Sequence, residues 1–280
     1  MWNIVDGTIL NITLEQMFHS NRSEGTLVQW SEASSKSRPA VVFIPGFLTE
    51  KTPVNKDPLS VWRKEIIAYA RKKDMAAFAV YWPSTPATAL FMNNSWIRLT
   101  GAVDMLKLAG VTVAGPMLLN PILLGANLGL SMTAVIAARR MWKKAVQNAD
   151  EVAEKSFKWL GALDRKIVLI GHSLGGRIAL KACATAPEQK IKKMYAMAPA
   201  VLKSECKPKK ITQNTKGRNT VYYSEHDWIL QFAFRIGEFT TKLPVGFDGK
   251  ISKLNTVDAS KKLNKEVGHI DYAKLCRKLL

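Results

Sequence analysis

The sequence predicts one large α/β domain with a mostly parallel, doubly wound sheet. Six short runs rich in β-branched and aromatic residues are separated by stretches long enough for crossover helices, the pattern typical of this fold class. With 280 residues, 47% of them hydrophobic, the chain can bury a sizeable core, which excludes a disordered chain. A glycine-rich turn also follows the third run, in the position where many α/β proteins place a catalytic residue.

The elements can be justified in chain order. Residues 1–37 are expected to form an N-terminal extension, in which TLVQW (26–30) is a candidate edge strand. Pro39 then leads into AVVFIP, an unbroken apolar run of the kind that a parallel sheet buries on both faces. We expect strands at 40–45, 75–82, 166–171, 192–198, 219–224 and 252–258, and helices at 59–73, 174–186 and 230–239. The main domain is therefore predicted to cover 38–280.

An insertion at about 84–160 separates the second strand from the third. Within it, residues 108–138 carry no charge, and about 20 such residues suffice to cross a bilayer. Prolines and asparagines interrupt the run near its middle, so we expect a hairpin of two short apolar helices, either in a membrane or packed on a soluble core. The run ends in RRMWKK (139–144), a basic and aromatic border typical of a membrane interface.

The charge balance bears on partners and location. A net charge of +19 attracts anionic surfaces, although dispersed lysines can also be a solvated surface. We do not expect nucleic acid as a partner, because no DNA- or RNA-binding motif accompanies the charge. The first residues lack the pattern of a secretory signal, so we expect a cytoplasmic or membrane-associated protein; no residue decides on export as a toxin. Three cysteines without metal-type spacing indicate no metal, and we expect no cofactor.

The clearest chemical signal is the sequence Gly171-His172-Ser173-Leu174-Gly175. It lies between a buried strand and a helix, which is the context of a nucleophile elbow. The sharp turn strains the serine backbone and needs small neighbours, so Gly171 and Gly175 are the expected elbow glycines. Ser173 is the candidate nucleophile, and the alternative is a tight structural turn. His172 is expected to be a packing neighbour.

A serine nucleophile needs a base and an orienting acid, which in this fold follow in the order acid, then histidine. His226 and His269 are the histidines downstream of the turn, and His269 lies after the last predicted strand, where the base belongs. Asp227 occupies the acid position after the fifth strand. A helix N-cap is the other interpretation of Asp227, and the rival acids are Glu225, Asp258 and Asp271.

Acyl transfer also requires backbone donors for the developing oxyanion. The amide of Leu174, directly after the nucleophile, is one candidate. The second is expected in the loop after the first strand, Pro45-Gly46-Phe47. Gly46 lets this backbone turn toward the substrate, so the Phe47 amide is the candidate donor.

The motifs FIPGFL, LIGHSLGGR, RNTVYYSEHDWIL and GHIDY resemble the α/β-hydrolase family of the transmembrane and coiled-coil domain proteins, over about residues 38–275. The resemblance implies an α/β-hydrolase fold and a triad of Ser173, Asp227 and His269, which agrees with the choice made from chain order. It also implies that the apolar segment belongs to the family pattern and that members associate with membranes. One departure is GHS, where relatives usually have GFS.

Together these observations predict a serine hydrolase that cleaves a carboxylic ester, acting as a lipase or phospholipase at a membrane. The apolar hairpin would be a lid near the carboxyl ends of the strands, where α/β active sites form. Two alternatives remain: a soluble esterase or thioesterase, and a catalytically silent basic module that binds membranes. The sequence carries no signal for head group, acyl length or oligomeric state.

Overall fold

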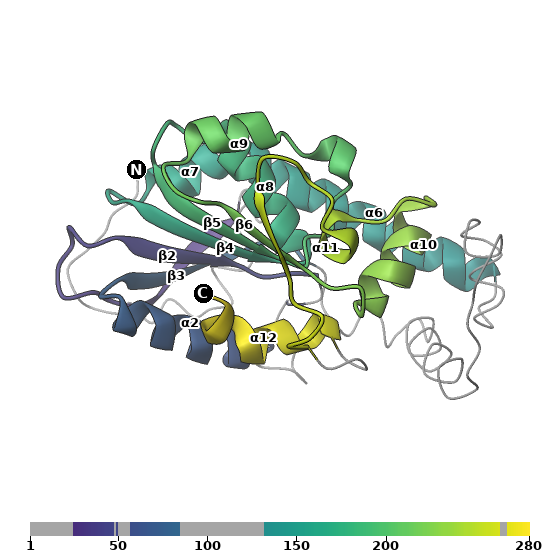
Figure 1. Cartoon of the computed structure of the whole chain (residues 1–280), viewed down its shortest axis with the longest axis horizontal. Helices are drawn as coiled ribbons and strands as arrows, with labels where there is room; N and C mark the ends of the chain where they lie inside the picture. Colours follow the sequence, from purple (N-terminus) through teal and green to yellow (C-terminus); the bar gives the residue numbers. More distant parts are fainter. Residues whose placement is uncertain (1–24, 48, 50–56, 85–131, 264–267) are drawn as a thin grey trace.

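The computed structural model describes residues 25–47, 49, 57–84, 132–263 and 268–280. Within these residues, seven strands form one sheet in the order β1-β3-β2-β4-β5-β6-β7 (Figure 1). Strands β2 to β7 are all parallel to one another, and the edge strand β1 pairs antiparallel with β3. The strands are β1 (Thr26–Ser31), β2 (Ala40–Ile44), β3 (Ala76–Tyr81), β4 (Ile167–His172), β5 (Ile191–Met197), β6 (Thr220–Tyr223) and β7 (Asn255–Asp258). The predicted α/β fold class is confirmed.

The burial of each strand agrees with its position in the sheet. Every residue of β2 and β4 is buried, as expected for parallel strands that are covered on both faces. Strands β1 and β7 are only partly buried and lie at the two edges. The candidate edge strand at 26–30 is therefore part of the sheet, although it lies within the predicted N-terminal extension.

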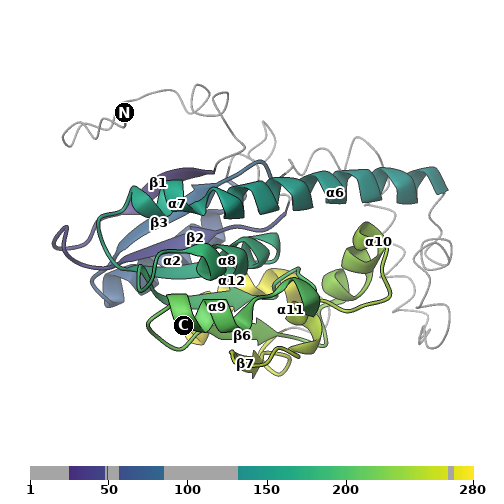
Figure 2. The same ribbon diagram turned by 90° about the horizontal axis from the view of Figure 1, so that it is seen from above.

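Helices cover both faces of the sheet (Figures 1 and 2). Helices α2 (Ser60–Lys72) and α12 (Gly268–Leu279) pack together on one face. The opposite face carries α6 (Met132–Glu154), α7 (Ser156–Gly161), α8 (Leu174–Thr185) and α9 (Pro208–Asn214). Shorter helices occupy the connections after β5 and β6: η3 (Lys203–Glu205), the π-helix η4 (Ile229–Ala233), α10 (Phe234–Glu238) and α11 (Val245–Asp248).

The part of the insertion that the structure describes differs from the sequence prediction. Most of the uncharged segment lies outside the described residues, and its last residues open α6. The predicted basic and aromatic border lies inside α6, where Trp142 is only 3% exposed. The interpretation of Trp142 as an interfacial aromatic is therefore wrong, because its ring packs within the protein. None of the helices in the described ranges is both long and apolar enough to span a bilayer.

The strand order fixes where a site can form. After β2 the chain moves outward to β3, and β4 then pairs on the other side of β2. Such a reversal leaves a crevice at the carboxyl ends of the two central strands, where open α/β sheets bind ligands. The ends of β2 and β4 are adjacent, with Ile44 beside Gly171. The loop 45–47 and the turn at Ser173 therefore meet at this point.

Candidate active site

The turn after β4 holds Ser173 in a backbone conformation that L-residues rarely adopt. Its φ is 55° and its ψ is −122°, a strained combination that persists only when surrounding contacts enforce it. The Ser173 amide donates to the Met197 carbonyl at 3.0 Å, and the Ser173 carbonyl accepts from the amides of Gly176 and Ala200. The adjacent strand and the first turn of α8 thus hold the serine between them, as a nucleophile elbow requires.

Three glycines make this turn sterically feasible. A Cβ on Gly171 would lie 2.3 Å from the Gly175 carbonyl oxygen, and one on Gly175 would lie 2.1 Å from the Ile44 carbonyl oxygen. A Cβ on Gly176 would approach the Pro199 ring to 2.9 Å. The first two are the predicted elbow glycines, and the third is an addition from the structure. Each keeps α8 in close contact with a neighbouring backbone or ring.

The loop after β2 lies directly against the serine. A Cβ on Gly46 would be 2.8 Å from the Ser173 Cβ. The Trp82 indole donates to the Pro45 carbonyl at 2.9 Å, and the Thr49 hydroxyl donates to the Gly46 carbonyl at 2.8 Å. Because a trans peptide is planar, fixing the Gly46 carbonyl directs the Phe47 N–H to the opposite side.

The other candidate oxyanion donor, the Leu174 amide, comes from the helix that follows the serine. Leu174 is the first residue of α8, and amides in the first turn of a helix have no partner within that helix. Such amides also carry the positive end of the helix dipole. The Leu174 amide is therefore suited to a developing negative charge beside Ser173.

Asp227 and His269 form a buried, hydrogen-bonded pair. The Nδ1 atom of His269 lies 2.6 Å from Oδ2 of Asp227, and the two residues are 6% and 0% exposed. The second oxygen, Oδ1, accepts from the Leu230 amide at 3.0 Å. Asp227 is thus a helix cap and an imidazole partner at once, which combines the two interpretations that its sequence position allowed. His269 lies in the first turn of α12.

His172 connects the elbow to the helix that carries His269. Its Nε2 donates to the His269 carbonyl at 3.0 Å, and its ring packs against those of Trp62, His269 and Tyr272. Burial, together with the nearby His269, lowers the pKa of His172 well below its ordinary value. Its Nε2 is committed to the His269 carbonyl and its ring is enclosed by three others, in keeping with the packing role expected for it.

The other candidate acids have different surroundings. Of the four carboxylates considered, all of which the structure describes, Asp227 is the one bonded to His269. The Asp258 carboxylate accepts a hydrogen bond from the Ser260 amide, and the Asp271 carboxylate lies 3.8 Å from Lys274. Glu225 contacts Ser260 through its backbone amide, which donates to the Ser260 hydroxyl.

The candidate nucleophile and base are not joined by a direct bond. His269 is engaged through Nδ1 with Asp227 and through its carbonyl with His172. Among the residues described, no hydrogen bond links the Ser173 hydroxyl to the His269 ring. In active sites without substrate this bond is often long, and it tightens when substrate binds.

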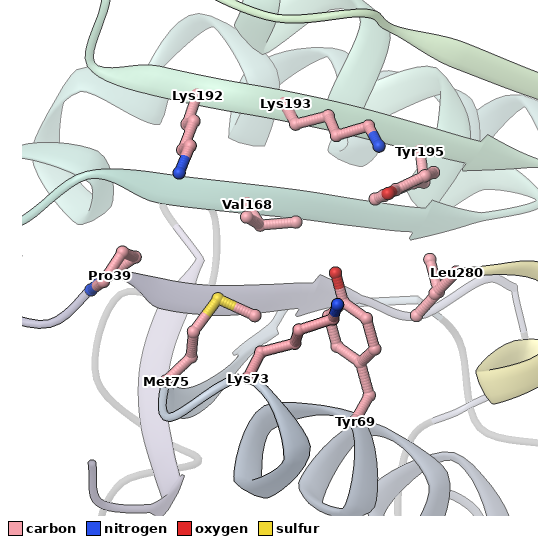
Figure 3. Close-up of a pocket in the computed structure, with 9 residues that line it drawn as sticks. All are labelled: Pro39, Tyr69, Lys73, Met75, Val168, Lys192, Lys193, Tyr195 and Leu280. Atoms are coloured by element: carbon pink, nitrogen blue, oxygen red, sulfur yellow. The ribbon is translucent and has the colours of Figure 1, made fainter. Parts of the chain in front are cut away.

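One hollow lies away from this site, between α2 and the amino ends of the strands (Figure 3). Its volume is about 280 Å³, and lysine and tyrosine side chains contribute to its lining, among them Lys73, Lys193 and Tyr195. None of the candidate catalytic residues lines it. In the described part of the chain, no group of three or more His, Cys, Asp or Glu side chains could hold a metal ion.

Sequence reasoning missed the residues that hold the site in place. Trp82 and Thr49 fix the loop after β2, and Arg177 of α8 binds Asp150 of α6 and Glu205 of η3. An arginine in a mostly apolar helix is a signal for the Arg177 contacts, since such a charge needs partners when it is buried. The bond from Trp82 to Pro45 spans 37 residues, and no local pattern indicates it.

A family model described as "Protein of unknown function (DUF726)" matches residues 112–280, more than half of the chain. The chain belongs to this family. No curated protein sequence matches it. The narrower resemblance to the transmembrane and coiled-coil domain proteins stays a prediction. The matched DUF726 region includes Ser173, Asp227 and His269, whereas β2 and β3 precede it.

Several solved hydrolase structures are similar to this member of DUF726. The monoacylglycerol lipase of Paleococcus ferrophilus has a TM-score of 0.42 and 12% identity, and the alignment covers 91% of this chain and 96% of that one. The LpqC poly(3-hydroxybutyrate) depolymerase of Bordetella parapertussis has a TM-score of 0.40 and 15% identity, with 91% and 83% covered. The α/β-hydrolase fold of this chain is assigned from its own strand order and from the turn at Ser173.

Proposed function

We propose that the protein is a serine hydrolase that cleaves a carboxylic ester through an acyl-enzyme. The observation that carries the proposal is the buried Asp227–His269 pair, found in the same protein as a serine held in strained backbone angles by close-packed glycines. Strain of this kind costs about 1–3 kcal/mol and clusters at functional sites.

In the proposed mechanism Ser173 Oγ attacks the ester carbonyl while His269 Nε2 takes the hydroxyl proton. Asp227 holds the imidazole in the tautomer with its proton on Nδ1 and stabilises the imidazolium that forms. The Phe47 and Leu174 amides bind the oxyanion. His269 then returns the proton to the leaving alcohol, and water, activated by the same imidazole, releases the acid and frees Ser173.

The substrate that we favour is a membrane lipid, which would make the enzyme a lipase or phospholipase. The net charge of +19 supports an anionic surface as a partner. Helix α6 exposes Arg140, Lys143 and Lys144, and it follows directly on the uncharged segment of the sequence. The predicted lid over the site falls on that segment, outside the described residues.

The test compares hydrolysis of anionic phospholipid vesicles and of p-nitrophenyl butyrate by the wild type, Ser173→Ala and Ser156→Ala. Ser156 is another buried serine and serves as a matched control. We expect Ser173→Ala to lose both activities by about 10⁶-fold with an unchanged melting temperature, and Ser156→Ala to keep both.

Each of the other outcomes would contradict the proposal or indicate a different function. Hydrolysis by a folded Ser173→Ala protein at the wild-type rate contradicts a serine mechanism. Activity on the soluble ester alone would indicate a soluble esterase or thioesterase. Vesicle binding with no hydrolysis by the wild type would indicate a silent membrane-binding module.

A further inference from the structure

Two arginines in this fold are equally buried but differ in their partners. Arg177 is 3% exposed and is held by Asp150 and Glu205, at distances down to 2.5 Å. Arg235 of α10 is 5% exposed, and its Nε atom has no hydrogen-bond partner among the described residues. Burial lowers the pKa of Arg235 from its ordinary value. A buried charge without a partner is costly, so Arg235 is an incomplete ion pair.

The position of Arg235 on α10 places it on the face that meets α6. Residues three positions apart lie on the same side of a helix, which groups Arg235 with Glu238, and Phe239 follows directly after the helix. Glu238 accepts a hydrogen bond from the Trp142 indole at 3.0 Å. The Phe239 ring lies 4.7 Å from the Arg139 guanidinium. Both contacts are with α6, and Figures 1 and 2 show the two helices together.

A second guanidinium lies on the facing side of α6. Arg139 is three residues before Trp142, hence on the same helix face, and its Nε is likewise buried without a hydrogen-bond partner in the described ranges. Glu238, the carboxylate closest in sequence to Arg235, accepts its hydrogen bond from the Trp142 indole. The two arginines thus lie on helices that pack together, each with an Nε donor that has no hydrogen-bond partner among the described residues, and the planar fork of arginine matches phosphate oxygens.

This junction borders the candidate active site. The Trp142 ring packs edge-on against Phe47 at 5.7 Å and against Phe234, next to Arg235, at 5.8 Å. One aromatic ring therefore separates the arginines from the loop of the candidate oxyanion donor. Ile136 of α6 and Phe239, directly after α10, are exposed at 42% and 43%. An anion that binds here has apolar surface beside it, which suits a lipid more than a free ion.

We propose that Arg235 and Arg139 bind the phosphate group of a phospholipid whose acyl ester is presented to Ser173. The inference rests on the proposed function for its catalytic part and narrows the membrane lipid to a phospholipid, with the residues that bind its phosphate. Binding of the phosphate can be measured without turnover, so the two proposals fail separately.

The binding test uses the Ser173→Ala protein and isothermal titration calorimetry with three probes: dioctanoyl phosphatidic acid, dioctanoylglycerol and inorganic phosphate. We expect the phosphatidic acid to bind and the other two to bind at least about tenfold more weakly. Arg235→Gln should weaken that binding by about tenfold or more, since a hydrogen bond to a charged group is lost. Arg38→Gln is the matched control, because Arg38 is exposed and paired with Asp74.

Three results would overturn the proposal. Equal affinity for inorganic phosphate and the lipid phosphate would assign the site to a free anion. Equal affinity for dioctanoylglycerol and phosphatidic acid would show that the phosphate is not recognised. A melting temperature that falls in Arg235→Gln without ligand would show a structural role, because removing an unpaired buried charge should leave it unchanged or raise it.

The catalytic arm compares wild type and Arg235→Gln on a phospholipid and on p-nitrophenyl butyrate. We expect kcat/KM for the phospholipid to fall by about tenfold, through KM, while the neutral ester is hydrolysed at the same rate. An equal fall for both substrates contradicts the proposal. If the wild type hydrolyses neither but the binding results hold, the phosphate site stands and the proposed hydrolase does not.

Discussion

The orientation of one peptide bond gives the sharpest test of the candidate oxyanion hole. The Thr49 hydroxyl donates to the Gly46 carbonyl at 2.8 Å, and the Trp82 indole holds the preceding Pro45 carbonyl at 2.9 Å. Together they direct the Phe47 N–H away from Thr49. Thr49→Val removes the hydroxyl and keeps the shape of the side chain, so the Gly46–Phe47 peptide loses the hydrogen bond to its carbonyl, while the bond from Trp82 to the preceding peptide remains.

The size of the effect follows from the lost bond. One hydrogen bond contributes about 1 kcal/mol net, which is about fivefold in the population of the competent orientation. We therefore expect kcat to fall about fivefold, and a complete flip of the peptide sets an upper limit of about 10²–10³-fold, the usual cost of an oxyanion donor. KM should stay within about twofold, because the oxyanion contact is made only in the transition state.

The assay is steady-state hydrolysis of p-nitrophenyl butyrate by wild type, Thr49→Val and Thr49→Ser. Thr49→Ser retains the hydroxyl and should recover most of kcat. Ser84→Ala removes the hydroxyl that contacts Thr49 at 3.1 Å and should have a smaller effect than Thr49→Val. The reasoning is refuted if Thr49→Val keeps full kcat, or if Thr49→Ser is as slow as Thr49→Val.

Three further predictions concern the base, the elbow and the buried imidazole. His269→Ala should lose at least about 10⁴-fold in kcat, whereas His226→Ala should lose less than about tenfold; the reverse order would assign the base to His226. Gly175→Ala should destabilise the fold by more than about 2 kcal/mol in urea unfolding, because its Cβ would lie 2.1 Å from the Ile44 carbonyl oxygen, and a variant of wild-type stability would contradict that packing. Because His172 has a lowered pKa in the folded state, the unfolded chain binds the extra proton below about pH 6.5, so stability should fall with decreasing pH by up to about 1.4 kcal/mol per unit. His172→Gln should reduce that slope, and an unchanged slope would mean that His172 is not the group responsible.

The sheet could be predicted because its strands carry a local signal. A parallel strand buried on both faces reads as a continuous apolar run, as Ala40–Ile44 does. The turn at Ser173 was visible for a related reason, since a serine with glycines two residues away on either side, between a strand and a helix, is typical of a nucleophile elbow. Chain order then selected Asp227 and His269, and the structure places these two side chains in contact.

The remaining features depend on contacts between distant segments. Trp142, within RRMWKK, has the sequence surroundings of an interfacial aromatic, but Gly237 and Glu238 lie against its ring nearly a hundred residues later. The helix that begins at Gly268 was not predicted, although it carries the candidate base. The unpaired Arg235 has no sequence signature, because a missing partner can be recognised only when the neighbours are known.

The central claim is that Ser173 is a nucleophile activated by His269, and an active-site-directed label tests it most directly. The protein would be treated with a fluorophosphonate, digested, and analysed by mass spectrometry of its peptides. We predict one stoichiometric phosphonyl adduct on Ser173, which is lost when the protein is unfolded before labelling and strongly slowed in His269→Ala. An unlabelled Ser173 in the folded protein, or an adduct on another residue, would contradict the account.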